Sequence, residues 1–202
     1  MKKLIAGVVL GVSLTAMAHG AGDPEAGEAN AQVCAGCHGA GGAEPIAPDY
    51  PKLSSLGEKY LYQQLKLIKS GDRAIASMTG ILDNRSDQDL QDLAAYFDSQ
   101  EMPTGQADPD LVDLGQSLYR GGNMATGVPA CAACHSPTGN GVDAAGYPHL
   151  GGQSAAYVEK QLKAYRDGER AAGQNASIMM DVAAKLTDQE IKAVSSYVSG
   201  LN

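Results

Sequence analysis

The chain has 202 residues and a formal net charge of −8 at pH 7. Such an acidic chain is poorly suited to binding nucleic acid or anionic lipid, because both present negative charge. With one Phe, no Trp and nine Tyr it has few large apolar side chains, and we expect a bound apolar group to fill part of the interior.

Residues 1–20 have the pattern of a secretory signal peptide. Lys2 and Lys3 precede an apolar stretch over residues 4–18, and small residues follow it up to Ala21, where we expect cleavage. The stretch is shorter than the roughly 20 residues of a membrane span, although an uncleaved anchor stays open as an alternative. We therefore predict a bacterial periplasmic protein without a transmembrane segment in its mature chain, with peripheral membrane association left open.

The charge that remains after residue 20 is unevenly distributed. Thirteen basic and 23 acidic residues give a net charge of −10, of which residues 21–105 contribute −7 and residues 106–202 contribute −3. The partners of so acidic a protein are expected to present basic docking patches.

Residues 21–202 are an internal duplication. A shift of 97 positions aligns the halves, pairing Cys34 with Cys131, Cys37 with Cys134, His38 with His135, Tyr60 with Tyr157 and Arg73 with Arg170. The second half then gains four residues, and a shift of 101 pairs Met78 with Met179. Pro103, Gly105 and Pro109 prevent a continuous helix between the halves. We predict domains at 21–100 and 111–202, joined by a linker at 101–110.

Each half is predicted to be helical. A first helix leads into each Cys motif, and a middle helix covers 58–70 in the first half and 155–167 in the second. The last helix of each half begins after Ser86 or after Thr187, where Thr187 and Glu190 form a capping box. The Gly- and Pro-rich segments between these helices are typical of loops, and no alternating strand pattern is present. The predicted fold class is all-α.

Both halves contain the motif C-x-x-C-H, the attachment signature of c-type haem. On a helical turn, positions i, i+3 and i+4 share one face. Two thiols can therefore join the haem vinyl groups while the imidazole reaches the iron. The motifs predict two covalently bound haem c groups, held by Cys34, Cys37, Cys131 and Cys134, with His38 and His135 as iron ligands.

Three other uses of paired cysteines are open. A zinc site places its two C-x-x-C pairs about 15 to 20 residues apart, whereas these are separated by most of a domain. Disulfides are compatible with an oxidising compartment. A thioredoxin-like redox pair needs a βαβ context, which the helical pattern does not provide. Two motifs in register within a duplication favour haem over all three.

The sixth iron ligand separates an electron carrier from an enzyme, because a Met/His pair saturates the iron and raises its potential. Met78 and Met179 occupy matching positions, 40 and 44 residues beyond their motif histidines. We predict both as ligands, with Met180 as a rival of Met179. Met102 and Met124 are interpreted as packing or surface residues.

Bis-histidine ligation of both haems would need four histidines, and only three follow residue 20, two of them in the motifs. The third, His149, aligns with Lys52 and is interpreted as a surface or loop residue. Tyr50 and Tyr147, each before a proline, are candidates either for donating to a haem or its propionates or for ordinary packing.

Together these features resemble the dihaem cytochrome c4 family over the whole mature chain. The resemblance lies in the two C-x-x-C-H motifs, the Tyr-Pro-x-Leu loops, the Met78-Thr79-Gly80 and Met179 segments, and the final helices. It implies two class I cytochrome c domains related by a pseudo-twofold axis, with haems close enough for direct electron exchange. It also implies His38–Met78 and His135–Met179 as axial pairs. The family often has a methionine where this chain has Ile81.

The leading hypothesis is an electron-transfer protein and not an enzyme. The resemblance implies transport in a respiratory chain, from a quinol-oxidising cytochrome complex towards a terminal oxidase. A dihaem peroxidase or reductase is the enzymatic alternative, which needs an iron with a vacant or releasable site. A haem-bearing sensor or docking subunit is a third. The greater acidity of the first half predicts a lower potential for its haem.

Overall fold

The structure is a computed structural model that describes residues 22–202, so the predicted signal peptide lies outside the described residues. Within these residues the chain is helical, with two isolated β-bridges and no β-strand. The all-α prediction is confirmed. No helix in the described part of the chain is long and apolar enough to cross a bilayer.

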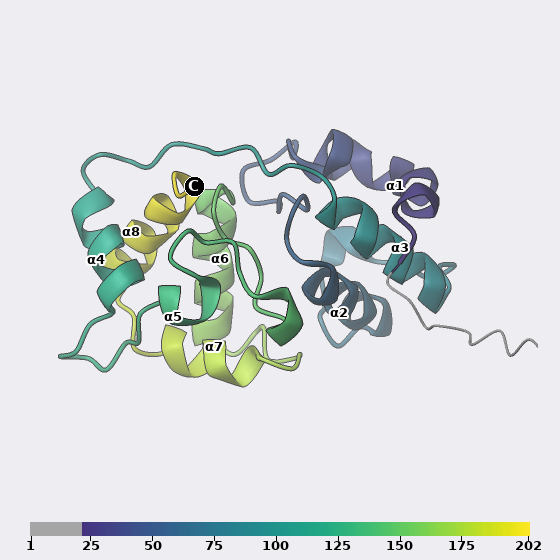
Figure 1. Cartoon of the computed structure of the whole chain (residues 1–202). Helices are drawn as coiled ribbons and strands as arrows, with labels where there is room; N and C mark the ends of the chain where they lie inside the picture. The colour runs from purple at the N-terminus through teal and green to yellow at the C-terminus, as the bar shows by residue number, and fades with distance from the viewer. Residues whose placement is uncertain (1–21) are drawn as a thin grey trace, which may run out of the picture.

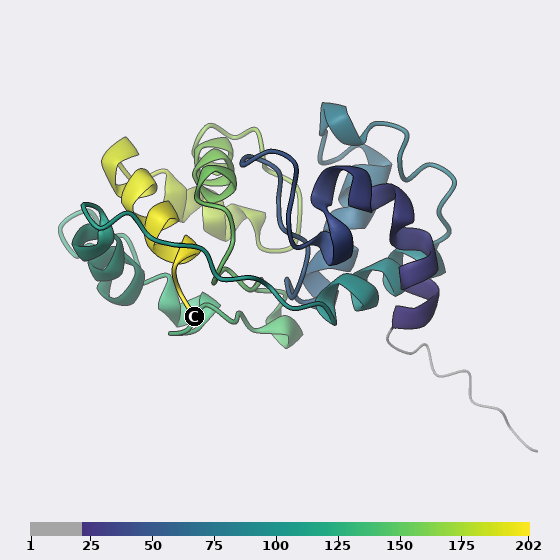
Figure 2. The same cartoon turned by 90° about the horizontal axis from the view of Figure 1, so that it is seen from above.

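The helices form two lobes. The first lobe contains α1 (Pro24–His38), α2 (Glu58–Ser70) and α3 (Asp87–Asp98), with 3-10 turns η1 (Ala40–Gly42) and η2 (Ala76–Met78). The second contains α4 (Val112–Gly121), α5 (Ala132–His135), η3 (Asp143–Ala145), α6 (Ala155–Arg166), α7 (Ala176–Ala183) and α8 (Asp188–Ser199). Figures 1 and 2 show the lobes side by side, with residues 99–111 running across both as a non-helical connection.

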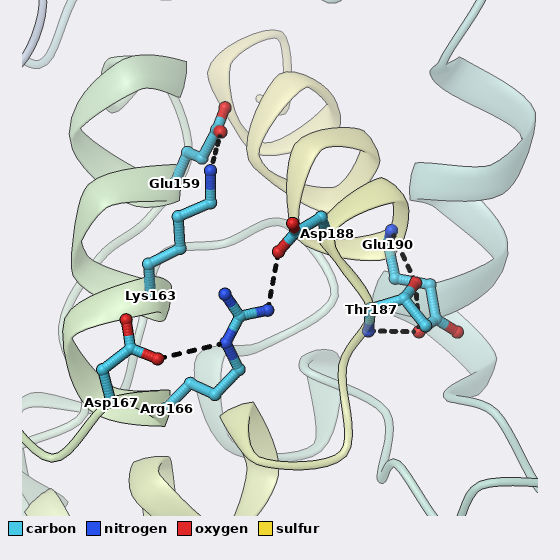
Figure 3. Close-up of polar contacts among 7 residues, drawn as sticks. All are labelled: Glu159, Lys163, Arg166, Asp167, Thr187, Asp188 and Glu190. Atoms are coloured by element: carbon cyan, nitrogen blue, oxygen red, sulfur yellow. Dashed lines mark hydrogen bonds and ion pairs between the residues drawn. The ribbon is translucent and has the colours of Figure 1, made fainter.

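Helix ends follow the local signals in the sequence. The Asp23 side chain accepts hydrogen bonds from the first turn of α1, and Gly71, at φ 83°, ends α2 in the left-handed conformation. Ser86 and Thr187 both form capping boxes, so the first half has one as well as the second. Figure 3 shows the Thr187–Glu190 pair at the start of α8.

Helix α8 is also joined to α6 at the surface. Arg166 at the end of α6 donates to Asp188 over 2.7 Å, and it also contacts the neighbouring Asp167 (Figure 3). Lys163 and Glu159 form a further pair one turn earlier. The Asp188 side chain is 74% exposed, and such exposed pairs contribute little to stability because solvent screens them. Apolar packing, not these ion pairs, holds the helices together.

The first and last helices of each half cross at a glycine. A Cβ on Gly27 of α1 would lie 2.0 Å from the Asp92 carbonyl oxygen of α3. A Cβ on Gly115 of α4 would lie 2.4 Å from the Ala193 carbonyl oxygen of α8. The backbones therefore approach more closely than any other residue type allows.

The two halves differ before the second Cys motif. Helix α1 runs into Cys34–His38 without interruption, whereas α4 ends at Gly121 and a loop precedes α5. Gly27 and Gly115 are related by a shift of 88, against 97 for the motifs, so nine residues are inserted here. The loop is closed by the Asn123↔Val128 bridge.

Each half has its own buried apolar cluster, and the motif cysteines pack against it. The first-half cluster consists of Ala31, Leu56, Leu61, Leu93, Ala94, Phe97 and Met102, with Cys34 and Leu53 beside it. The second-half cluster consists of Tyr119, Val128, Val158, Leu162, Leu186, Ile191, Val194, Tyr197, Val198 and Leu201, with Cys131, Leu150 and Met179 beside it. The C-x-x-C-H motifs thus lie at the edges of the two cores.

Substitution of Gly115 tests the close helix crossing. We expect Gly115→Ala to lower the free energy of unfolding of the purified protein by about 1–3 kcal/mol, because the added methyl group forces α4 and α8 apart. Gly121→Ala, in the same helix, meets nothing within 4 Å and should be neutral or stabilising. Chemical denaturation of both variants measures the difference, and equal effects would contradict the packing argument.

Candidate functional site

The C-x-x-C-H motifs are helical in both halves, as their spacing predicts. Cys34 and Cys37 lie in the last turns of α1. In the second half the amide of His135 donates to the Cys131 carbonyl over 2.9 Å, which closes a helical turn around Cys134. Both motifs therefore present two thiols and an imidazole from one turn of helix.

The chain reverses immediately after each motif histidine. The next residue, Gly39 or Ser136, has a positive φ, of 77° and 68° respectively. Only glycine fits at position 39, because a Cβ there would lie 2.3 Å from the Glu44 carbonyl oxygen. Ser136 adopts a positive φ although it has a side chain, which is an unfavourable conformation for a residue other than glycine. Its carbonyl accepts a hydrogen bond from the buried Tyr119 hydroxyl over 2.7 Å. These turns send the following loop back past the imidazole.

Both motif imidazoles are fixed by the same hydrogen bond. His38 Nδ1 lies 2.9 Å from the carbonyl oxygen of Pro51, and His135 Nδ1 lies 2.9 Å from that of Pro148. A carbonyl only accepts, so Nδ1 carries the proton and Nε2 keeps a free lone pair. This is the arrangement of a metal-binding histidine with its outer hydrogen bond in place. The Tyr-Pro pair that recurs in both halves was the sequence signal for this hydrogen bond.

Burial keeps both imidazoles neutral. His38 and His135 are each 7% exposed. Burial lowers the pKa of each, and the proline carbonyl opposes this only in part. A neutral imidazole with a protonated Nδ1 is the form that binds iron through Nε2.

The predicted site residues of the second half converge on one cavity of ≈ 200 Å³. Its wall includes Cys131, Cys134, His135 and Met179. Apolar side chains of the second-half core, among them Leu162 and Val194, form much of the remainder. Two thiols, an imidazole and a thioether sulfur around an apolar space fit a c-type haem held by thioether bonds.

The first half contributes to this same cavity, which sequence analysis did not predict. Leu56, Tyr60, Gln63 and Gln64 belong to its wall although they come from the first lobe. A repeat alignment pairs equivalent positions but does not indicate which residues cross between domains. Residues of the first lobe therefore form part of the wall of the second-half cavity.

The structure distinguishes the two adjacent methionines of the second half. Met179 lines the cavity and packs against the buried core. Met180, one position along α7, is not among the residues that line it. Met78 is half-buried at the end of η2. Helix α7 itself was not predicted and arises where the second half gains four residues.

The remaining methionines lie away from the motifs. Met102 is buried in the first-half core at 8% exposure, and Met124 is 95% exposed in the inserted loop. Tyr50 and Tyr147 lie beside the motif histidines, with ring centroids 6.3 and 6.1 Å away. These positions are consistent with packing against the imidazoles.

His149 takes part in the contact between the lobes. Its Nδ1 lies 3.1 Å from the Ser55 carbonyl oxygen, and the aligned Lys52 donates from Nζ to the Gly152 carbonyl over 2.8 Å. The two aligned positions thus reach across the interface in opposite directions, as the two sides of a twofold-related contact do. His149 is a half-buried interface residue that also lines the second cavity.

The environment of the first cysteine in each motif does not favour thiolate chemistry. Burial raises the pKa of the Cys34 thiol, and it raises the pKa of Cys131 to about 11. Redox-active and zinc-binding cysteines require a lowered pKa, because the thiolate is the reactive form. A thioether bond needs no charge on sulfur, so attachment to haem is compatible with this burial.

Comparisons with known proteins agree with this geometry. The family model described as "Cytochrome c" matches residues 112–202, and the model "Cytochrome C oxidase, cbb3-type, subunit III" matches residues 22–97. Cytochrome c4 of Pseudomonas aeruginosa is 53% identical over 202 residues, which is 100% of both chains. A thiosulfate dehydrogenase electron acceptor from Thiomonas intermedia is 36% identical and covers 98% of this chain and 91% of its own.

A solved structure has the same fold over most of the chain. The crystal structure of reduced recombinant cytochrome c4 from Pseudomonas stutzeri superposes with a TM-score of 0.86 at 49% identity. It covers 90% of this chain and 100% of its own. The tandem duplication is thereby confirmed, and the paired cysteines of the two halves fit two covalently bound haem c groups. The chain belongs to the cytochrome c4 family of dihaem electron-transfer proteins.

Proposed function

We propose that His38 and Met78 are the axial iron ligands of the first haem, and His135 and Met179 those of the second. The observation that carries this is the second cavity, where His135 and Met179 share a wall with both motif cysteines. The repeat extends the assignment to the first half, because His38 makes the same 2.9 Å bond to a proline carbonyl. Axial Met/His ligation raises the potential and leaves no position for substrate.

The protein's own residues then do three things. The motif cysteines hold the cofactor covalently, so it is retained outside the cytoplasm. The proline carbonyls orient the imidazoles and increase their basicity through Nδ1. The buried apolar clusters exclude water and lower the local dielectric, which is one of the ways in which a protein sets a haem potential.

We further propose that the protein works in the periplasm, carrying electrons from a quinol-oxidising cytochrome complex towards a terminal oxidase. The signal-like segment at residues 1–20 supports the location, and the family supports the role. The net charge of −10 over residues 21–202 favours partners with basic docking surfaces. A periplasmic extract should contain a haem-staining protein whose mass corresponds to a chain starting at Ala21 plus two haems.

Membrane vesicles test the route. With quinol as donor they should reduce the ferric protein, and with oxygen present they should oxidise the ferrous protein in a cyanide-sensitive reaction. Both rates should fall as salt rises, because exposed charges are screened over about 10 Å at 0.1 M. Vesicles that reduce and oxidise the protein no faster than buffer does would exclude this route.

The relative from Thiomonas intermedia favours a second donor, since its name describes an acceptor for thiosulfate dehydrogenase. In this version of the role the cytochrome takes electrons from a thiosulfate-oxidising enzyme. Faster reduction by such an enzyme with thiosulfate than by vesicles with quinol would favour it.

Methionine substitutions test the axial assignments. Met78→Ala and Met179→Ala should each keep both haems attached, abolish the Met–iron charge-transfer band of one ferric haem, and open that iron to carbon monoxide. Met180→Ala is the matched control and should do none of these. Absorption spectra with and without carbon monoxide provide the measurement. If Met180→Ala opens the second iron, the assignment of Met179 is wrong.

The charge distribution predicts unequal potentials. Residues 21–105 carry −7 against −3 for residues 106–202, and negative surroundings favour the ferric form. The first haem should therefore have the lower potential, and added salt should narrow the gap. A spectroelectrochemical titration should resolve two one-electron waves. One doubled wave at low salt would contradict the prediction.

A further inference from the structure

An arginine of the first half stands where the second half has a buried leucine. The repeat pairs Arg85 with Leu186, each directly before the capping box of its last helix. The local backbone is the same in both halves, because the amide of each residue donates to the carbonyl three positions earlier over 3.1 Å. Leu186 is 7% exposed and lines the second-half cavity beside Cys131 and Met179.

A second position of the repeat differs in the same way. Asn30 corresponds to Leu118, since each lies three residues after the glycine at which the first and last helices cross. Leu118 is 3% exposed and also lines the second-half cavity. Two apolar wall residues of the second site are therefore matched by two polar residues in the first half.

In the first lobe these two polar residues bond to each other. Arg85 Nη1 donates to Asn30 Oδ1 over 2.6 Å, and Nη2 donates to the Asn30 carbonyl over 3.4 Å. Asn30 lies on α1 four residues before Cys34, and residues four apart share one face of a helix. The guanidinium is therefore held on the face of α1 that carries the first motif cysteine.

The Arg85 charge has no carboxylate in direct contact. Arg85 is half-buried, and within residues 22–202 no Asp or Glu forms an ion pair with it. Asp89 is connected only through Asn30, whose amide donates to it over 3.1 Å. Burial raises the pKa of the Cys34 thiol, and the positive charge of Arg85 opposes this. The field of the guanidinium thus reaches the sulfur that attaches the first haem.

We propose that Arg85 and Asn30 form part of the wall of the first haem site and that the Arg85 guanidinium raises the potential of that haem. The proposal rests on the dihaem sites proposed above. Arginine is always charged in proteins, and a fixed positive charge beside a haem disfavours the ferric state. Arg85 offsets part of the negative charge of residues 21–105. Asn30 is a positioning residue, because it acts through the guanidinium.

Spectroelectrochemical titration of the full-length, haem-loaded protein tests the proposal. Arg85→Gln should lower the equilibrium constant for reduction of the first haem about threefold, or about 28 mV for one electron, and should leave the second wave in place. The gap between the two waves should widen. Arg85→Lys should keep most of the wild-type potential, since the charge remains. The wave that moves in Met78→Ala identifies the first haem.

A second arginine variant guards against a folding defect. Leu186 shows that leucine is accommodated at this position of the repeat, so Arg85→Leu should keep both haems and lower the same wave. Lys66→Gln is the matched control, because it removes one positive charge from the same lobe at a side chain that is 54% exposed and paired with Asp87. It should move the first wave much less, since solvent and salt screen an exposed charge.

The role of Asn30 is tested by a double-mutant cycle. Asn30→Leu alone should lower the first wave by less than Arg85→Gln does, because the charge remains but loses its fixed position. In the Arg85→Gln background the same change should have a smaller effect than it has alone. Equal effects of Asn30→Leu in both backgrounds would show that Asn30 does not act through Arg85.

Several results would overturn the proposal. An unchanged first wave in Arg85→Gln, or the same drop in Arg85→Lys, would show that the guanidinium charge does not act on the haem. A drop in Lys66→Gln as large as in Arg85→Gln would show that only the net charge of the lobe matters. A haem count other than two in the unmodified protein would instead be a failure of the proposed function.

Discussion

The candidate site depends on one hydrogen bond that the chain makes twice. In each half a proline carbonyl accepts the Nδ1 proton of the motif histidine, at 2.9 Å in both cases. The bond selects the tautomer, fixes the ring and ties the motif helix to the loop that returns past it. Proline suits this position because its ring restricts the loop backbone while its carbonyl stays available. Without this contact the imidazole would lose the partner that fixes its orientation, and the site would be weakened.

The duplication also governs how the halves meet. Aligned positions face each other across the contact, so Lys52 and His149 each reach a backbone carbonyl of the other lobe. In a contact between two copies related by a twofold axis, the same pair of positions meets twice. The two positions carry different side chains, a lysine in the first half and a histidine in the second, and the reciprocal bond is present in both directions.

Much of the fold could be predicted because its signals are local. The bounds 58–70 of α2 follow from an amphipathic pattern that ends at Gly71, and the start of α3 follows from Ser86. The rotation of α7 about its axis determines which of the two adjacent methionines faces the cavity. The sequence alone does not give this rotation, so Met180 remained a rival of Met179. The nine-residue insertion before the second motif was hidden because the motifs themselves align without a gap. Which first-lobe residues line the second-half cavity depends on domain packing, which no local pattern contains.

The departures from the repeat are concentrated around the second site. The inserted loop buries Val128 in the core beside Cys131, and α7 replaces a 3-10 turn to bring Met179 to the cavity. Each change adds protein around one site, whereas Cys37 of the first motif remains exposed. Because a lower local dielectric penalises the charged ferric state, added cover acts on the potential in the same direction as the weaker negative charge of residues 106–202. The cover around the second site and the charge distribution therefore predict the same order of haem potentials, with the first haem the lower.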